Sequence, residues 1–498
     1  MPRPDKDRFL LAALLATGAL WASSCAVPLG PGYSIEKQTV DVRFVPAPET
    51  RIEFSADYQL RNTGNQPLSA FELRLPPERR LRVESVSITW DGQAIPFERR
   101  GDSGGKILSM QLSSSWPIKQ VHALHLQYRI APGEANGPQL DFPADSFYLP
   151  PGVWLAALLP PPGTFASGGA PPKSWVLFLT APGDFLVHAT GELKRQAQRD
   201  GEARLEFEQG ARDRSPFVMA GRYHEQKYRG SPYTVIIWRK TAFEPADAER
   251  LAHKVQQIAK TYDGMFGPRG GHARPVWIAD SPVPAKWHDQ TVPLPNGSLG
   301  VAESIFFPRP PPDCAFIHVS ESDGTLFEQE KMGREIALSL AETWLGYGQG
   351  PSSSTLPSPM AQLPDYAAAV SREAEESTGG ASRERSIHEA LERVPISGAG
   401  QSAKRAGMNA DDSLLFFYAL EDKYGREHLH AALRHMVQAR RLQTYEVQDL
   451  MAALEQETHQ EVGSFFRLWL KHPGIPEEFR ARYEAPAEPK TASEEGKK

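Results

Sequence analysis

The chain has 498 residues, of which 40% are hydrophobic and 23% charged, and its formal net charge at pH 7 is −6. This composition is typical of a folded globular protein and argues against a mainly disordered chain. The length predicts about three domains. The mild negative charge, without any tract rich in Lys and Arg, argues against nucleic acid as a partner.

Residues 1–25 have the pattern of an export signal. Three basic residues among the first eight precede an apolar run, Phe9–Trp21, and three small residues then lead to Cys25. The run is too short to span a bilayer comfortably and ends at a processing-type site. We expect an exported protein on the periplasmic side of the cell envelope, held to a membrane by a lipid on Cys25. The alternative is ordinary signal cleavage after Ala26, which gives a soluble secreted protein.

The cysteine count agrees with this interpretation. Cys25 and Cys314 are the two cysteines of the chain, so a lipid on the first leaves the second unpaired, and no disulfide framework is expected. After residue 25, no stretch approaches the ~20 apolar residues that a membrane-spanning helix needs.

From residue 31 onward the chain shows the pattern of β-strands. Apolar residues alternate with polar ones over 52–60, the period of a half-buried strand. Trp90-Asp91-Gly92-Gln93 predicts a hairpin, because Asp-Gly favours a tight turn between two strands. Further strands are predicted at 122–130, 174–180, 203–208 and 233–238.

Beyond this region the pattern changes to helices. Apolar residues within Ala246–Phe266 recur at spacings of three and four, which predicts a helix ending near Gly267. A second amphipathic pattern predicts a central buried helix over 326–346. The remaining predicted elements are a strand at 274–279 and helices at 384–393, 411–424, 426–441, 445–457 and 461–471.

The stretch 334–346, R-E-I-A-L-S-L-A-E-T-W-L-G, carries the most informative motif. Its end, Thr343–Gly346, resembles the exit of the zinc-binding helix of the gluzincin aminopeptidases (peptidase family M1), where H-E-x-x-H runs into Q-W-F-G. Residues 414–425 resemble the helix that follows the family's catalytic tyrosine. Residues 465–476 resemble the family's closing F-F-x-x-W…G-x-P pattern. The resemblance extends over most of 40–480.

The resemblance implies an α+β multidomain fold. The expected parts are an N-terminal antiparallel β saddle or sandwich, a thermolysin-like mixed α/β domain and C-terminal helices. We place the signal at 1–25, the β domain at 31–228, the thermolysin-like domain at 229–400 and the helical part at 401–484. The polar tail, 485–498, is expected to be disordered.

The residues at the family's zinc and catalytic positions have changed. Leu338 and Glu342 stand in place of the two histidines, Ser339 in place of the general-base glutamate, Pro364 in place of the third ligand, and Ala410 in place of the oxyanion-stabilising tyrosine. Zinc in such a site needs two imidazoles on one helical face, a carboxylate and an open water position. Leucine and proline offer no donor atom, and serine is a poor base near neutral pH. The resemblance therefore implies a degenerate member with no catalytic residue and no metal or other cofactor.

One binding element of the family is better retained. The stretch from Gly300 to Ser304, G-V-A-E-S, resembles the family's G-A-M-E-N segment. In that segment the glutamate holds the free amino group of a peptide, so Glu303 is the expected partner of an ammonium group. The alternative is a solvated glutamate at the end of a strand.

Other histidines are weaker candidates for a metal site. His388 and Glu392 share a helical face, but they lie in a polar segment, 376–405, for which we expect a surface excursion. His428 and His430 lie two residues apart and therefore point about 200° apart on a helix, so they cannot chelate one ion.

We favour a catalytically inactive aminopeptidase-like envelope protein that binds a peptide or protein partner through the groove retained from the family. An alternative is an active metallo-aminopeptidase with a non-standard zinc site that draws on Glu342, Asp365 and a histidine such as His318. A second alternative is a structural envelope module whose β domain is the contact surface.

Overall fold

The structure is a computed structural model of the whole chain. It describes residues 32–46, 49–76, 82–102, 105–131, 144–150, 154–159, 172–210, 216–231, 233–242, 244–269, 275–280, 291–293, 299–301, 314–317, 330–345, 359–376, 379–394, 410–439, 446–471 and 474–484. These residues belong to two compact units. The predicted signal and the predicted disordered tail lie outside the described residues.

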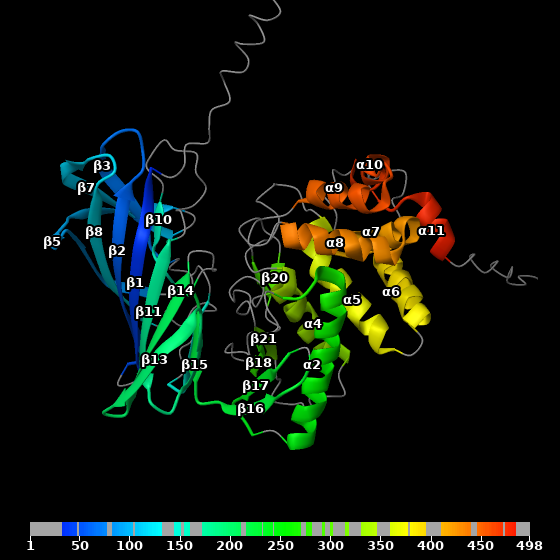
Figure 1. Cartoon of the computed structure of the whole chain (residues 1–498), viewed down its shortest axis with the longest axis horizontal. Coiled ribbons are helices and arrows are strands. Elements are labelled where there is room, and N and C mark those ends of the chain that lie inside the picture. The colour runs from blue at the N-terminus through cyan, green and yellow to red at the C-terminus, as the bar shows by residue number, and fades with distance from the viewer. Residues whose placement is uncertain are drawn as a thin grey trace, which may run out of the picture. The chain divides into compact units, whose positions relative to one another are not determined.

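The first unit takes the described residues of 1–145, 152–184 and 188–213 and consists of two β-sheets (Figure 1). Among the described residues, an eight-stranded sheet has the order β13-β14-β11-β1-β2-β8-β4-β5, and a four-stranded sheet has the order β10-β3-β7-β6. The strands are β1 (Tyr33–Val45), β2 (Arg51–Asn62), β3 (Leu68–Arg74), β4 (Arg82–Trp90), β5 (Gln93–Ala94), β6 (Phe97–Asp102), β7 (Gly105–Trp116), β8 (Val121–Ala131), β10 (Ala157–Leu159), β11 (Ser174–Pro182), β13 (Glu192–Arg199) and β14 (Glu202–Gly210).

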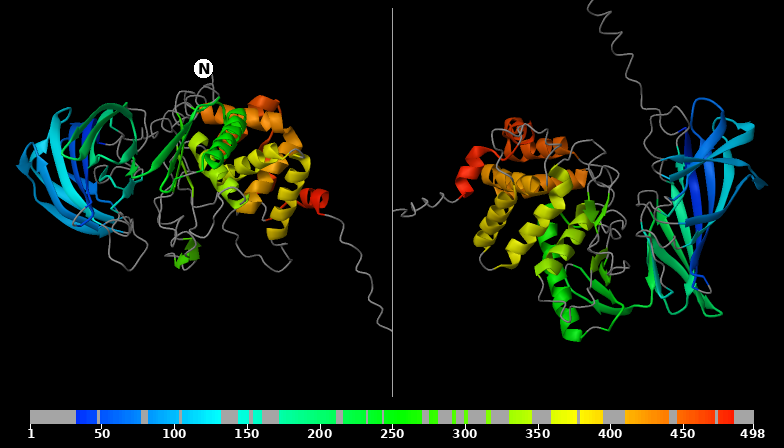
Figure 2. Two further views of the ribbon diagram at one scale, coloured as in Figure 1. Left: turned by 90° about the horizontal axis from the view of Figure 1, so that it is seen from below. Right: turned by 180° about the vertical axis from the view of Figure 1, so that it is seen from behind.

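Alternating side chains form the core of this unit. In β2, the five apolar residues Ile52, Phe54, Ala56, Tyr58 and Leu60 are all buried, as the period of two predicts. The two sheets contribute to one core, because the rings of residue 71 on β3 and residue 90 on β4 have centroids 5.0 Å apart. The eight-stranded sheet is visibly curved when it is seen from below (Figure 2).

The predicted hairpin is confirmed. β4 and β5 pair through Trp90 and Gln93, and the two turn residues have positive φ, 49° for Asp91 and 80° for Gly92. Both values fit the tight turn that the Asp-Gly pair favours.

The expectation of an entirely antiparallel β domain is wrong at one pair. β1 lies in the interior of the eight-stranded sheet, antiparallel to β2 but parallel to β11. Parallel neighbours cannot be joined by a tight turn, and here the strands from β2 to β10 lie between them in sequence. A pattern of alternation predicts the strands without predicting this long-range partner.

The second unit takes the described residues of 146–151, 185–187 and 214–498. Its strands are β9 (Ser146–Leu149) and β15 (Val218–Gly221), which pair with β12 (Leu186–Ala189) in the order β12-β15-β9, then β16 (His224–Tyr228), β17 (Val235–Arg239), β18 (Val276–Asp280) and β21 (Cys314–Ile317) in the order β16-β17-β18-β21, and β19 (Thr291–Pro293) with β20 (Leu299–Val301). β17, β18 and β21 run parallel. The chain thus enters this unit near residue 146, returns briefly at 185–187 and again near residue 214, whereas the sequence predicts one boundary at 228.

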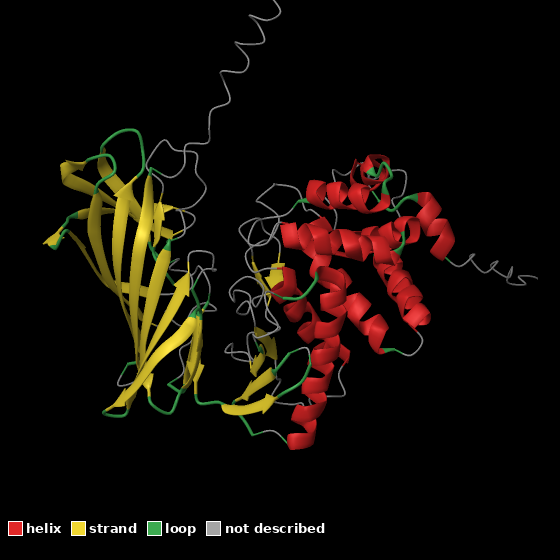
Figure 3. Cartoon of the chain, viewed as in Figure 1, coloured by secondary structure: helices red, strands yellow, loops and turns green. Residues whose placement is uncertain are grey.

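Helices make up most of the second unit (Figure 3). They are α2 (Pro245–Phe266), α4 (Glu330–Leu345), the 3-10 helix η3 (Pro359–Gln362), α5 (Leu363–Glu375), α6 (Gly379–Arg393), α7 (Ala410–Tyr424), α8 (Arg426–Ala439), α9 (Val447–Thr458), α10 (Gly463–Lys471) and α11 (Glu477–Tyr483). Apolar residues of these helices and of β17 and β18 share one buried core. The coarse prediction, a large N-terminal β region followed by C-terminal helices, is confirmed.

Three features of the helical region were not predicted. α5 and α11 are absent from the predicted elements, and α6 is longer than expected. The surface excursion expected at 376–405 is wrong over α6, because Ser382, Ile387 and Ala390 are buried there. In the part of the chain that the structure describes, no helix is long and apolar enough to cross a membrane.

Candidate functional site

The residues of α4 that the family resemblance compares with the zinc and base positions lie on a packed helix. Leu338 is half-buried and contacts the apolar core of the second unit. Ser339 and Glu342 are half-buried as well. The hydroxyl oxygen of Ser339 is itself buried, and it has no hydrogen-bond partner within the described part of the chain.

The Thr-Trp-Leu exit of α4 serves as an anchor for the helix. The indole Nε1 of Trp344 donates to Asp263 Oδ1 of α2 at 3.0 Å, and the Tyr233 hydroxyl donates to the same oxygen at 2.8 Å. Burial, followed by the hydrogen bond to Asp263, raises the pKa of Tyr233 to about 12. Two turns earlier on α4, the Ala337 carbonyl accepts from the Tyr262 hydroxyl at 2.7 Å. The motif therefore fixes α4 to α2.

α5 begins beside α4. Pro364 occupies its first turn, where proline lacks only an N–H that has no partner inside the helix anyway. The next residue, Asp365, accepts from Arg334 of α4 at 3.4 Å. Burial raises the pKa of the Asp365 carboxyl; Arg334 opposes this, and the charge of Asp411 adds to it. Because Asp411 follows Ala410 at the start of α7, the structure brings the starts of α5 and α7 near α4.

The other predicted binding residues are not brought to this place by the described structure. Gly300 lies in β20 and is paired with Val292 of β19. Glu303, His318 and Cys25 lie outside the described residues, so their roles stay predictions.

The residues at α4 and α5 do not fit a zinc ion of the gluzincin type. The family resemblance compares Leu338 and Pro364 with two of the three ligand positions, and neither side chain has a donor atom. Over the described ranges, no three His, Cys, Asp or Glu side chains gather closely enough to hold a metal ion.

The other histidines of the helical region differ in their exposure. His388 and Glu392 are both exposed on α6, as a solvated helical face requires. His428 of α8 is also exposed, whereas His430 is only half-buried and faces inward toward α5.

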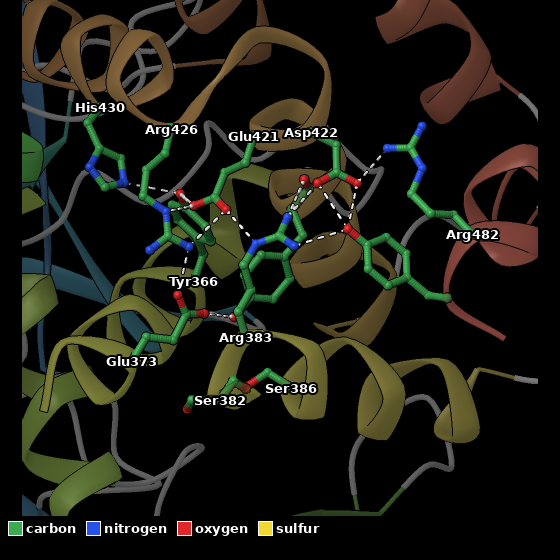
Figure 4. A network of polar contacts seen from close by, with 12 residues as sticks. Tyr366, Glu373, Ser382, Arg383, Ser386, Glu421, Asp422, Arg426, His430 and Arg482 are labelled. Carbon is green, nitrogen blue, oxygen red and sulfur yellow. Dashed lines mark hydrogen bonds and ion pairs between the residues drawn. The ribbon is translucent and has the colours of Figure 1, made fainter. Parts of the chain in front are cut away.

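A network of buried polar side chains crosses α5, α6, α7 and α8 (Figure 4), and sequence reasoning missed it. At its centre, Glu421 accepts from Arg426 Nε at 2.8 Å and from Arg383 Nε at 3.0 Å. The Tyr366 hydroxyl also donates to Glu421, at 2.5 Å from Oε1, the oxygen that accepts from Arg426 Nε. The side chain of Glu421 is only 4% exposed, so these contacts replace the water that a carboxylate otherwise binds.

A second carboxylate extends the network into α5. Glu373 accepts from Arg426 at 2.6 Å and from the Tyr418 hydroxyl at 2.7 Å. Burial raises the pKa of Glu373, while the hydrogen bond from Tyr418 and the charge of Arg426 oppose the rise. Glu373 thus joins α5 to both α7 and α8.

A third carboxylate connects the network to α11. Asp422 accepts from Arg383 at 2.6 Å, from Arg482 at 3.0 Å and from the Tyr483 hydroxyl at 2.8 Å. Burial lowers the pKa of Arg383, but its hydrogen bonds to Tyr483 and Glu421 raise it above the usual range. Three arginines and three carboxylates therefore balance each other across five helices.

A separate ion pair is buried at the carboxyl ends of two parallel strands. Arg239 of β17 pairs with Asp280 of β18, and the backbone N–H of Lys240 donates to the other oxygen of Asp280 at 2.8 Å. Lys240 also donates to the Ser146 hydroxyl of β9 at 2.9 Å. These contacts attach β9 to the parallel strands of the second unit.

Solved structures with a similar fold are zinc metallopeptidases. The M1 zinc metallopeptidase from Deinococcus radiodurans is 15% identical, with a TM-score of 0.55 over 90% of this chain and 96% of its own. A mutant of that enzyme bound to a Tyr-Ser-Ala substrate is 15% identical, with a TM-score of 0.55 over 89% of this chain and 96% of its own. A mutant two-domain M1 zinc metallopeptidase bound to L-arginine is 14% identical, with a TM-score of 0.56 over 89% of this chain and 95% of its own. Neither a family model nor a curated protein sequence matches the chain. The similarity supports an M1 peptidase-like fold, and at this identity it supports the fold alone.

Proposed function

We propose that the protein is a catalytically inactive M1 peptidase-like protein of the cell envelope. In this proposal a saddle-like β domain and a thermolysin-like domain are retained, and the groove of the fold binds a peptide or protein partner. The chain does not hydrolyse peptide bonds, because the residues that would bind zinc and activate water are absent.

The observation that carries the proposal is the packing of α4 and α5. The fold is M1-like, yet the side chain of Leu338 on α4 contacts the apolar core, and Pro364 lies in the first turn of α5. Neither can bind a metal, and Ser339 cannot replace a glutamate as a general base near neutral pH.

Measurements of zinc content and of peptide hydrolysis test whether the protein lacks peptidase activity. We expect the purified chain, loaded with zinc and then dialysed, to retain much less than one zinc per molecule by elemental analysis. We also expect no release of fluorophore from aminoacyl fluorogenic substrates. Stoichiometric zinc together with hydrolysis that a chelator abolishes would contradict the proposal and favour the non-standard metallopeptidase.

A variant with restored ligands provides the matched control. The combination Leu338→His, Ser339→Glu, Glu342→His and Pro364→Glu rebuilds the donor set on the same backbone. If these positions correspond to the zinc positions of the fold, this variant gains close to one zinc per chain. The variant Glu342→His alone supplies one imidazole and is expected to bind no additional zinc.

Binding of a partner is tested with free and N-acetylated short peptides. If Glu303 holds a terminal ammonium, free peptides bind more tightly than acetylated ones, and Glu303→Ala removes the difference. If the β domain alone is the contact surface, Glu303→Ala leaves binding unchanged.

The membrane anchor at Cys25 is part of the same proposal. A chain expressed in a bacterium that processes lipoproteins is expected to incorporate labelled palmitate and to sediment with membranes. Cys25→Ala is expected to lose both properties. Labelling of the Cys25→Ala variant, or a soluble unlabelled wild type, would favour ordinary signal cleavage instead.

A further inference from the structure

His430 meets α5 at the edge of the buried network. Its Nε2 lies 3.2 Å from the Tyr366 hydroxyl, and the two rings are arranged edge to face with centroids 6.3 Å apart. Tyr366 is completely buried in the first turns of α5, two residues after Pro364. The contact between the two residues therefore lies at the point where α5 begins to pack against α7 and α8.

The protons of this contact can be assigned by counting donors. Glu421 accepts from two arginines, and the single proton of Tyr366 points to it at 2.5 Å. The phenol oxygen can then only accept from His430, and the proton of the neutral ring lies on Nε2. Nδ1 is therefore the nitrogen to which a second proton adds.

Four groups act on the charge of His430. Burial lowers the pKa of His430 to about 4; Glu421 of α7 opposes this, while Arg426 and Arg434 of α8 strengthen it. Tyr366 of α5 stays neutral, because burial raises its pKa far above the usual range. A proton on the inward-facing ring is thus disfavoured by both its surroundings and its neighbours.

Within the described residues, the polar contacts of α8 with α9 and α2 involve side chains other than His430. Glu457 of α9 faces His435 at 3.8 Å. α2 approaches α8 through the Gly264 carbonyl, which accepts from Arg434. Glu421, the carboxylate that favours a charged His430, already accepts from two arginines and from Tyr366, whereas the half-buried position of His430 on α8 lets a charged ring reach water.

We propose that His430 is an acid-sensitive latch, which holds the first turns of α5 against α7 and α8 near neutral pH and releases them as the pH falls. In the latched state the neutral ring donates to Tyr366. In the released state the charged ring turns to solvent, Tyr366 loses a donor, and the start of α5 opens more often. The inference is independent of the proposed function, because it concerns the packing of α5 and requires no partner.

The direction of the effect follows from linkage. A histidine has an ordinary pKa of 6.5, and in the folded chain this one is lowered. The unfolded or opened state therefore binds the proton first, and stability is lost as the pH falls from 6.5 toward 4. Burial raises the pKa values of Asp365 and Glu373, so these carboxyls act in the opposite direction. A matched variant is needed to separate the two effects.

His430→Gln provides that variant, because an amide can still donate to Tyr366 but cannot be protonated. Amide hydrogen exchange of residues 363–375 is measured in the full chain from about pH 7 to about pH 4.5, with correction for the intrinsic rate. We expect protection of α5 to fall roughly tenfold more in the wild type than in His430→Gln. His428→Gln, which removes an exposed histidine of the same helix, is expected to behave as the wild type.

A second measurement addresses the titration directly and does not depend on the variant folding well. In NMR spectra of the chain labelled at its histidine rings, one resonance is expected to titrate far below 6.5 and to be absent from His430→Gln. An ordinary titration for His430 would overturn the inference. Equal loss of α5 protection in the wild type and His430→Gln would overturn it as well.

Discussion

Tyr366 contributes its hydroxyl as well as its ring to the second unit. The ring stacks on Phe417 at 5.0 Å between centroids, while the oxygen joins Glu421 to His430. In the sequence this residue is only the fourth letter of an altered family motif. Its polar partners lie 55 and 64 residues away, so no local pattern could show them.

Tyr366→Phe is expected to destabilise the chain by about 1–2 kcal/mol, because Glu421 and His430 each lose a buried partner. Urea unfolding monitored by circular dichroism measures the change. Tyr424→Phe is the control, since the Tyr424 hydroxyl is buried and, among the described residues, has no hydrogen-bond partner. It is expected to cost close to nothing, and equal losses for both variants would contradict the assigned role.

Leu338 offers a second prediction at this scale. Because its side chain is half-buried against the core, Leu338→Ala is expected to cost about 2 kcal/mol, the low end for such a change in a core. Leu338→Met keeps the volume and is expected to cost less than about 1.5 kcal/mol. Unfolding free energies that are unchanged in Leu338→Ala would mean that the residue has no packing role.

Periodicity predicted most helices and failed where polar partners come from far away. α2, α4, α7, α8, α9 and α10 follow apolar spacing that can be seen in the sequence. α5 was missed because Pro364 suggests a break, although it stands at the start of a helix, and because the buried residues that follow include small and polar ones rather than a periodic series of large apolar ones. The burial of α6 was missed because Arg383 and its neighbours are polar, and their partners on α7 and α11 were not foreseeable.

The same reason limits what the sequence shows about the candidate site. The absence of donor atoms at Leu338 and Pro364 follows from the residue types and a family motif. That Asp263 holds Trp344, or that Asp365 pairs with Arg334, depends on contacts 81 and 31 residues apart. A motif aligns residues along the chain, whereas these contacts arise from helix packing.

At the scale of elements, Glu373 joins three helices, and its replacement is expected to weaken the packing of all three. Glu373→Gln is expected to cost about 2 kcal/mol near pH 4.5, because Arg426 and Tyr418 lose part of a buried partner. The cost is expected to fall as the pH rises. The folded pKa of Glu373 is raised above 4.5, so the stability linked to its proton is present below 4.5 and lost as the pH rises through the folded value.

Thermal unfolding of wild type and Glu373→Gln at several pH values measures this effect. Glu376→Gln is the control on the same stretch, because the side chain of Glu376 forms a longer ion pair, with Arg385 at 3.5 Å. A cost of Glu373→Gln that grows with pH would contradict the direction of the pKa shift.

At the scale of the whole molecule, the two units are interleaved along the chain. β9 precedes β11 and β14 of the first unit in sequence, yet it pairs with β15 of the second. Tyr148 of β9 lies in an apolar cluster with Met219, Trp238 and Phe316. No single cut in the sequence separates one unit from the other.

A chain split between residues 213 and 214 is therefore expected to reassociate. The second fragment lacks β9 and leaves the edge of β15 and the side of Trp238 without their cover, so alone it should aggregate or lose stability. Co-expressed fragments are expected to purify together, because β9 and β12 of the first fragment both neighbour β15 of the second. Residue 149 faces 218 in the β9–β15 pair, and Leu149→Pro in the first fragment should weaken copurification, whereas Leu193→Pro, in the exposed strand β13, should not. Two fragments that fold separately and stay apart would contradict this view.

The position of β1 also determines how the first unit bears mechanical load. The strand is hydrogen-bonded on both sides, to β2 over its whole length and to β11 from Gln38 to Arg43. A force applied at its N-terminal end, Tyr33, along the strand direction loads both hydrogen-bond ladders in shear at once, whereas an edge strand would be peeled away bond by bond. A tether attached before residue 33 would thus pull on one of the most resistant points of the sheet, so the domain can be held by its N-terminal side without being unravelled from it.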